Sequence, residues 1–212
     1  IKVPQDDSVV RYTKWNHKRI LIRRSRGLAP NYFLGKLDFP SDSILAFGAD
    51  LKSGFSLSHQ GNVYVSQYLG DLSHFDTQAV FSYVRDHLCT TLESKSTAVL
   101  HDMHPQYSST ILAQDWALQQ GVQSYPYQHH KAHFASVLGE HNLFESKEKV
   151  LGVVWDGTGF GEDQAIWGGE FFSYENHRFE RLAHFEYVDW LAADKMTKEP
   201  RLSLLSMLPE AD

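Results

Sequence analysis

The sequence contains almost no cysteine: Cys89 is the single one among 212 residues. One cysteine cannot form an intrachain disulfide, and such scarcity fits a reducing compartment, so we expect a cytoplasmic protein. The chain also lacks an apolar run of the ~20 residues that a membrane-spanning helix needs, and no membrane partner is expected. Basic residues do not outnumber acidic ones, with 20 Lys and Arg against 26 Asp and Glu. The formal net charge of -6 argues against nucleic acid as a partner.

What is present is an ordinary globular composition, 42% hydrophobic and 22% charged. The length allows one large domain or parts of two. The chain opens without Met and closes on "RLSLLSMLPEAD", in the middle of a helix-like pattern. We therefore expect a piece of a longer protein.

From Ser43 onward the pattern predicts alternating strands and helices. Three short apolar or alternating runs flank turn residues and predict strands, and the runs that follow alternate between helical and strand periodicity. The predicted strands are 44–49, 54–58, 62–68, 96–103, 122–127 and 149–156, and the predicted helices are 76–94, 108–120 and the histidine-rich segment at 127–141. This βββαβαβα order predicts an α/β fold. It is a mixed sheet with helices on both faces, the order of a ribonuclease-H-like or actin-like ATPase lobe, with a truncated second lobe from near Val150.

The stretch "VVWDGTGFGED" carries a G-x-G-x-G pattern. A dinucleotide fingerprint would require a helix directly after it, but "QAIWGGEFFSY" has the alternation of a strand. The segment therefore predicts a strand–turn–strand hairpin. Its glycines could still present backbone N–H groups to a phosphate, although a plain glycine turn is slightly favoured. The phosphate candidates are Gly157, Thr158, Gly159 and Gly161.

Asp156 and two histidines form the strongest candidate site. His129 and His133 are four residues apart, which places both imidazoles on one face of a helix. Asp156 ends an apolar run, where ligands gather in α/β folds; it could bind a metal, orient a water, hold Mg²⁺ at a phosphate, or cap the following turn. Two imidazoles and one carboxylate suit Zn²⁺ or Fe²⁺. His130 and His141 are expected to face solvent or pack.

Two further candidates depend on loops. Asp102 and His104 follow a predicted strand and could form an acid/base pair. Alternatively His104-Pro105 breaks the strand and Ser108 or Ser109 caps the next helix, which the spacing alone favours.

Lys52 lies in a loop between the first two strands of the lobe. It could contact a phosphate, whereas a solvated lysine is the commoner case.

Several strings together resemble one family, in order and over nearly the whole chain. They are "DDSVVR", "RRSRGLAP", "GADLKSGFSL", "QYLGDL", "DMHPQYSST", "QHHKAH", "WDGTGFGEDQAIWGGEF" and "KEPRLSLLSML". The family that they resemble is HypF, the carbamoyltransferases of [NiFe]-hydrogenase maturation. The resemblance implies that residues 1–40 end a YrdC-like domain and its linker, 41–149 form the first actin-like lobe, and 150–212 begin the second.

The resemblance also implies an activity and partners. The positions of His129, His133 and Asp156 bind a metal in that family. Carbamoyl adenylate, made from carbamoyl phosphate and ATP, donates its carbamoyl group to a C-terminal cysteine of a HypE-type protein. Lys131 departs from the pattern, because family members usually have histidine there, so Lys131 is not expected to be an essential ligand.

Two alternatives stay open on the sequence. An O-carbamoyltransferase for small molecules shares the H-x-x-x-H and acidic strand-end plan, although "RRSRG" and "DMHPQYSST" count against it. The other alternative is a truncated, non-catalytic binding module.

Overall fold

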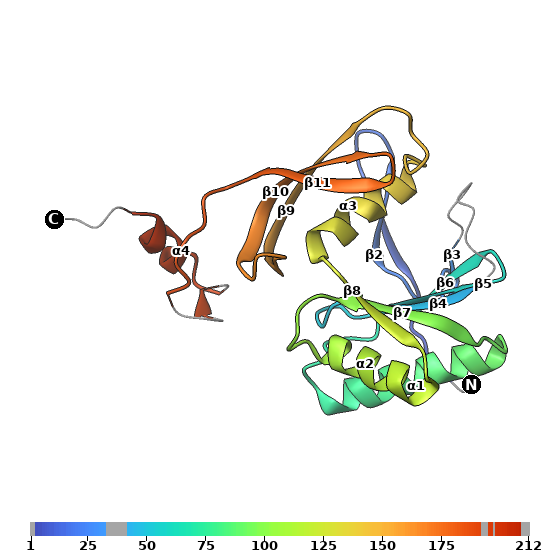
Figure 1. The fold of residues 1–212 in the computed structure, drawn as a ribbon. Coiled ribbons are helices and arrows are strands. Elements are labelled where there is room, and N and C mark those ends of the chain that lie inside the picture. The colour runs from blue at the N-terminus through green and yellow to red at the C-terminus, as the bar shows by residue number, and fades with distance from the viewer. Residues whose placement is uncertain (1–2, 33–41, 192–194, 197, 209–212) are drawn as a thin grey trace. The chain divides into compact units, whose positions relative to one another are not determined.

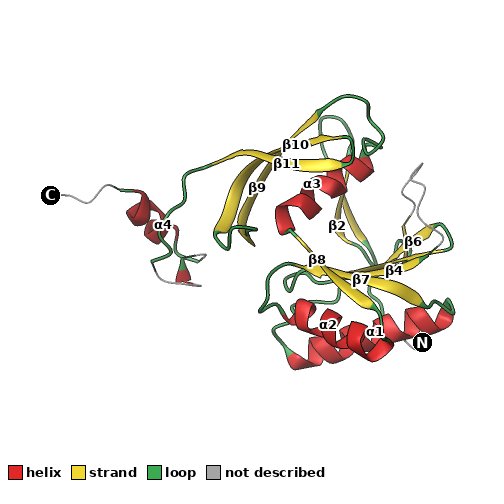
Figure 2. Cartoon of the chain, in the orientation of Figure 1, coloured by secondary structure: helices red, strands yellow, loops and turns green. Residues whose placement is uncertain are grey.

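The structure is a computed structural model that describes residues 3–32, 42–191, 195–196 and 198–208. The chain forms two compact units, Ile1–Tyr127 and Gln128–Asp212, and each is described by itself. Figure 2 shows their helices and strands. The predicted division at residues 40 and 149 stays a prediction, and its residues 33–41 lie outside the described part of the chain.

The first unit contains a six-stranded mixed sheet with the order β3-β6-β5-β4-β7-β8. Its strands are β3 (Asn31–Tyr32), β4 (Ser43–Phe47), β5 (Phe55–His59), β6 (Asn62–Val65), β7 (Ser96–Asp102) and β8 (Gln123–Tyr127). β3, β6, β5 and β4 pair antiparallel, whereas β4, β7 and β8 pair parallel. The three predicted antiparallel strands are confirmed, and so is the alternation of helices and strands that follows them.

Helices α1 (Phe75–Thr91) and α2 (Ser108–Gln120) lie on the same face of this sheet (Figure 1), so among the described residues of the first unit the prediction of helices on both faces is not met. The α1 and α2 crossovers advance through the sheet in the same direction, and right-handed connections of that kind place their helices on one face. Residues in β4 alternate between buried and half-buried, as a strand covered on one face should. The core joins both helices to the sheet, with Phe81, Trp116, Leu45, Leu57 and Val99 among its members.

The start of α2 is stabilised from a distant loop. The carboxylate of Asp50 accepts hydrogen bonds from the backbone N–H groups of Ser108 (3.0 Å) and Ser109 (2.9 Å). The prediction that Ser108 or Ser109 caps this helix is wrong, because both lie inside its first turn and Tyr107 precedes it. A negative charge at a helix N-terminus satisfies N–H groups that have no partner within the helix.

A two-stranded N-terminal ribbon, which the sequence pattern did not predict, precedes the large sheet. β1 (Val9–Tyr12) and β2 (Arg19–Arg23) pair antiparallel. The guanidinium of Arg24 donates to the carbonyl oxygens of Leu28, Val65 and Ser66, which ties this segment to the end of β6.

The second unit is built on a three-stranded antiparallel sheet with the order β11-β10-β9. Its elements are α3 (His129–Glu140), β9 (Val150–Phe160), β10 (Ile166–Glu175), β11 (Arg178–His184) and α4 (Pro200–Met207). Phe134 and Leu138 of α3 pack on Val154, Trp167 and Phe172. The predicted β9–β10 hairpin is confirmed. Its turn comes later than predicted, at 161–165, because β9 continues through the glycines.

In the part of the chain that the structure describes, no helix is both long and apolar enough to cross a membrane.

Candidate metal centre

The first turn of α3 brings two imidazoles together. The helix begins at His129, and Gln128 caps it by accepting a hydrogen bond from the backbone N–H of Lys131 at 2.9 Å. His129 and His133 then project from one face, one turn apart. Their Nε2 atoms are 3.1 Å apart. The predicted helical pair is confirmed as a geometric pair.

Asp156 brings a carboxylate to the same point. Its Oδ2 atom lies 2.9 Å from His129 Nε2 and 3.4 Å from His133 Nε2. Its Oδ1 atom accepts the backbone N–H of Gly157 at 2.7 Å, which fixes the direction of the carboxylate. Asp156 lies within β9 and not at its end as predicted. The β9–β10 register shifts beside it, between Trp167 and Gly169, so a bulge replaces regular pairing at this position.

The three donor atoms fit a divalent cation. Two donor atoms each ~2.1 Å from one ion lie about 3.0 Å apart at a right angle and about 3.4 Å apart at a tetrahedral angle. The observed separations of 2.9, 3.1 and 3.4 Å cover that range. Asp156 Oδ2 is also buried and accepts no hydrogen bond, although His129 Nε2 is near. A buried carboxylate oxygen without a donor is costly, and a cation would satisfy it. His129, His133 and Asp156 are together called the triad below.

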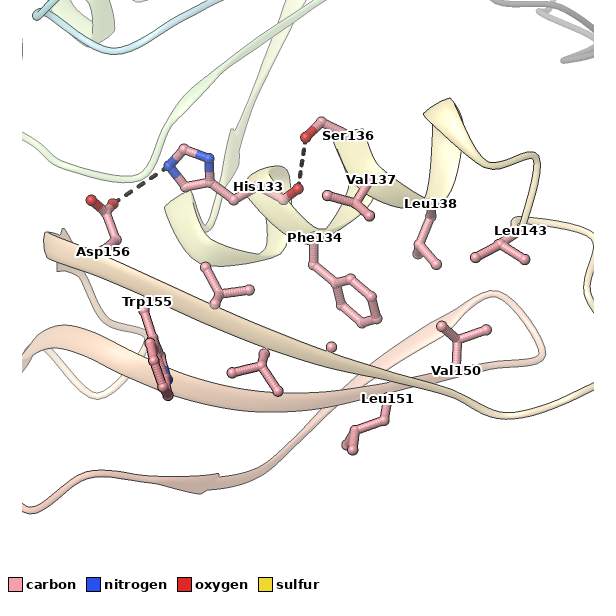
Figure 3. Close-up of a pocket in the computed structure, with 13 residues that line it drawn as sticks. His133, Phe134, Ser136, Val137, Leu138, Leu143, Val150, Leu151, Trp155 and Asp156 are labelled. Carbon is pink, nitrogen blue, oxygen red and sulfur yellow. Dashed lines mark hydrogen bonds and ion pairs between the residues drawn. The ribbon is translucent and has the colours of Figure 1, made fainter. Parts of the chain in front are cut away.

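A groove lined by His133 and Asp156 of the triad runs along α3 and β9 (Figure 3). Its volume is about 490 Å³, and its walls are mainly apolar. The His133 side chain is 54% exposed and that of Asp156 30%, so the triad opens to this side. Two imidazoles and one carboxylate leave positions free for other ligands, the arrangement expected of a catalytic metal site and not of a structural one.

His130 packs inside the second unit. Of the two expectations, facing solvent or packing, the structure confirms packing, because the His130 side chain is fully buried. Its ring lies against Gly159 of β9, where an added Cβ would be 2.5 Å from His130 Cε1. Burial lowers the pKa of His130, with Asp156 and Glu170 opposing that effect. His130 is therefore a buried packing residue next to the triad. His141 is exposed.

The glycine candidates fall into two kinds. Gly159 and Gly161 are needed for packing, because an added Cβ would clash with His130 at the first and with Trp167 Nε1, 2.1 Å away, at the second. Gly157 has open space around its Cβ position. Its N–H is already donated to Asp156, and that of Gly161 to Ala165. Thr158 is half-buried between them in β9. Phosphate binding by this segment stays a prediction.

A polar network that the sequence reading missed holds the β9–β10 turn. Asp163 accepts hydrogen bonds from Trp167 Nε1 (2.7 Å) and Tyr187 Oη (2.6 Å). Arg181 lies 3.8 Å from the centre of the Trp167 ring and pairs with buried Glu170 at 2.6 Å. Burial alone would raise the pKa of Asp163, but these hydrogen bonds and Arg181 lower it to about 2. Only the tertiary structure brings these residues together.

Lys131 forms an ion pair that connects two elements of the second unit. Its ammonium group pairs with Glu162 in the β9–β10 turn, so it links the first turn of α3 to the hairpin. That Lys131 is not an essential metal ligand stays a prediction, and its pairing with Glu162 agrees with it.

The remaining candidates, Asp102, His104 and Lys52, lie in the first unit. The Oδ1 atom of Asp102 accepts the backbone N–H of His104 at 2.8 Å, and the His104 ring stacks on Tyr107 at 4.2 Å. These contacts shape the turn after β7. Lys52 lies in the β4–β5 loop with a φ of +50° and lines a cavity with Arg23 and Tyr68. Catalysis by Asp102 and His104, and phosphate binding by Lys52, stay predictions.

Two family models match the chain. Residues 40–140 match the model described as the HypF Kae1-like domain. Residues 152–212 match the model described as carbamoyltransferase, Kae1-like domain, second subdomain.

Curated relatives cover nearly all of the chain. A probable carbamoyltransferase HypF of Methanocaldococcus jannaschii is 36% identical over 97% of the chain, and a carbamoyltransferase HypF of Synechocystis sp. is 36% identical over 98%. The chain covers 26% of each of these proteins, so it spans about a quarter of their length.

Solved structures agree with the fold. The crystal structure of T. kodakarensis HypF matches with a TM-score of 0.81 at 34% identity, over 95% of this chain and 26% of that one. A full-length HypF in a phosphate- and nucleotide-bound form matches with a TM-score of 0.76 at 34% identity, over 87% of this chain and 23% of that one. The predicted fold class, an α/β lobe of the actin-like type, is confirmed.

Proposed function

The chain belongs to the HypF family, as its sequence motifs predicted, and from this premise we propose that it is part of a cytoplasmic carbamoyltransferase of [NiFe]-hydrogenase maturation. Because the chain spans about a quarter of its curated relatives, the activity is proposed for the whole protein to which this sequence belongs. The relatives are named carbamoyltransferases, which supports a transferase.

The proposed reaction moves a carbamoyl group from carbamoyl adenylate to sulfur. Carbamoyl phosphate and water give carbamate and phosphate, and carbamate then attacks ATP to give carbamoyl adenylate and pyrophosphate. The acceptor is the C-terminal cysteine of a HypE-type protein. The thiolate attacks the carbamoyl carbon, a C–S bond forms, and the C–O bond to the phosphate of AMP breaks. The acceptor thiol must lose its proton before or during attack.

The triad is proposed to hold Zn²⁺ or Fe²⁺, and Mg²⁺ would accompany the nucleotide phosphates. A bound divalent cation would supply Lewis-acid polarisation of the carbamoyl carbonyl. His129 and His133 would hold that cation through imidazole nitrogens, and Asp156 through a carboxylate oxygen. The Gly157 N–H holds the carboxylate in place through Oδ1, so that Oδ2 stays directed toward the imidazoles.

The apolar groove beside the triad supports the same proposal. Phe134, Val137 and Leu138 line it on α3, and β9 supplies the opposite wall. Apolar walls lower the local dielectric, which strengthens electrostatic interactions at the triad.

One observation carries the proposal: buried Asp156 Oδ2 lacks a hydrogen-bond donor while two imidazole nitrogens lie within 3.4 Å of it. The test uses the full-length protein with ATP, carbamoyl phosphate and a HypE-type acceptor. Mass spectrometry of the acceptor should show the addition of one carbamoyl group at its C-terminal cysteine. His133→Ala should abolish that addition. An unmodified acceptor with the metal-loaded wild-type protein would contradict the proposal.

A further inference from the structure

Gln128 is an unusual residue for the place it occupies. It precedes the first ligand, His129, caps α3, and is only 3% exposed. Ser, Thr, Asp and Asn are the preferred residues at a helix N-cap, because their short side chains reach the N–H groups of the first turn. Capping alone therefore does not explain a buried glutamine here.

The carboxamide of Gln128 makes three hydrogen bonds. Its Oε1 accepts from the backbone N–H of Lys131 at 2.9 Å. Its Nε2 donates to the backbone carbonyl of Phe160 at 3.1 Å and to His130 Nδ1 at 3.2 Å. A backbone N–H must donate and a backbone carbonyl must accept, so only this orientation of the amide satisfies both partners.

These bonds connect the two segments that carry the triad. Lys131 and His130 lie in the first turn of α3, between the ligands His129 and His133. Phe160 lies on β9, four residues beyond Asp156. The imidazoles thus come from a helix and the carboxylate from a strand, and one buried side chain joins the helix start to that strand.

The same bonds fix the wall behind the triad. Because Gln128 donates to Nδ1 of His130, that imidazole carries its proton on Nε2. The fully buried ring then lies against Gly159, where no side chain could fit. A changed His130 orientation would therefore press on β9 close to Asp156.

We propose that Gln128 is the positioning residue of the triad: by bonding Lys131, His130 and Phe160 at once, it sets the distance between the helix-borne imidazoles and Asp156 for a divalent cation. This inference rests on the proposed metal site. Gln128 touches no reacting group and acts only through the ligands. Groups that orient metal ligands typically change metal affinity 10- to 100-fold when they are replaced.

The test measures Zn²⁺ affinity in the full-length protein by competition with a chromophoric chelator. Gln128→Glu keeps the size and the acceptor for Lys131 but loses both donors. Gln128→Ser keeps a strong N-cap and cannot reach Phe160. Tyr174→Phe is the matched control, since it removes a hydrogen bond to the Phe144 carbonyl in the same unit and touches no triad residue. Co²⁺ absorption spectra of the same proteins report the ligand geometry directly.

The expected result is a 10- to 100-fold loss of Zn²⁺ affinity with an altered Co²⁺ spectrum in both Gln128 variants, and neither change in Tyr174→Phe. Affinity within threefold of the wild type in either folded variant would overturn the positioning role. So would an equal loss in Tyr174→Phe, or failure of both Gln128 variants to fold. A wild-type protein that binds neither ion would overturn the metal site itself, a result that differs from all of these.

Discussion

Two aspartates, Asp102 next to histidines in the sequence and Asp156 next to histidines in space, lie in different units and have different surroundings. Asp102 ends β7 in the first unit, and its Oδ1 accepts the backbone N–H of His104. Asp156 lies within β9 in the second unit, and its buried Oδ2 accepts no hydrogen bond while two imidazole nitrogens face it. The sequence rule that drew attention to both, an acidic residue near a strand end, does not separate them.

The difference teaches that the partners of each carboxylate oxygen decide its role. A carboxylate that accepts backbone N–H groups is stabilised within the fold and shapes a turn. One that faces two imidazoles without a donor is unfavourable until a cation or proton arrives. The Oδ1 atoms of Asp102 and Asp156 both accept a backbone N–H, so the buried Oδ2 of Asp156, which faces two imidazoles, is the observation that supports the proposed metal site.

The largest effect is expected when the two aspartates are replaced in the same way. Asp156→Asn should weaken Zn²⁺ binding by more than about 100-fold, because a direct ligand matters more than the outer contacts that give 10- to 100-fold. Asp102→Asn should leave the affinity within about twofold, since Asp102 supplies none of the three donor atoms of the triad. Chelator competition and metal analysis of the purified proteins measure both. Equal losses in the two variants would break the comparison.

Metal should also stabilise the two units unequally. At a free Zn²⁺ concentration of 100 times Kd, binding stabilises the folded state by about 2.7 kcal/mol. Hydrogen exchange should show that protection in α3 and β9 rises with Zn²⁺ and falls with a chelator. β4 and β7 of the first unit should remain unchanged. A uniform rise over both units would contradict a site confined to the second.

Replacing Gly159 and Gly157 in turn tests how closely β9 packs against α3. Gly159→Ala places a Cβ 2.5 Å from His130 Cε1 and should cost about 1–3 kcal/mol, the usual price of overpacking. It should also weaken metal binding, because the His130 ring lies 5.8 Å from the ring of His129. Gly157→Ala has open space and should change stability by less than about 0.5 kcal/mol. Urea denaturation of both variants compares them; similar costs would show that β9 and α3 are not closely packed.

The smallest expected effect on stability concerns a third aspartate, Asp163, whose carboxylate oxygens accept several hydrogen bonds. The pKa of Asp163 is lowered to about 2 from 3.8. A lowered pKa stabilises the folded state above pH 3.8, and this contribution is lost as the pH falls from 3.8 to about 2. Because the side chain is 43% exposed, we expect only about 1 kcal/mol at pH 7.

Asp163→Asn should therefore lower the urea midpoint at pH 7 and have little effect near pH 2, without changing Zn²⁺ affinity more than about twofold. Tryptophan fluorescence follows the unfolding. An equal destabilisation at both pH values would show that the charge of Asp163 is not the stabilising feature.

Much of the fold follows from periodicity in the sequence. Strand alternation and helical spacing predicted β4 to β8, α2 with its end at Gly121, α3 and the β9–β10 hairpin, all of which the structure contains. The β1–β2 ribbon was missed, because its strands are exposed on both faces and lack a clear apolar alternation. The position of Asp156 within β9 was missed because glycines usually end a strand, whereas here they continue it beside α3.

Of the candidate site, the sequence predicted the three residues of the triad. His129 and His133 are local in sequence, and Asp156 belongs to the next apolar run, so pattern and spacing identify them as candidates. Gln128, His130 and Asp163 act through contacts with Phe160, Gly159 and Tyr187, which are 24 to 32 residues away. The Asp50 cap of α2 spans 58 residues. Such contacts depend on the folded backbone, and no local pattern marks them.

The most direct test of the central claim is anomalous diffraction from crystals of the full-length protein loaded with one equivalent of Zn²⁺. The account predicts one strong peak about 2.0–2.2 Å from the Nε2 atoms of His129 and His133 and from Oδ2 of Asp156. A peak coordinated by other residues, or no peak between these three side chains in loaded crystals, would contradict it.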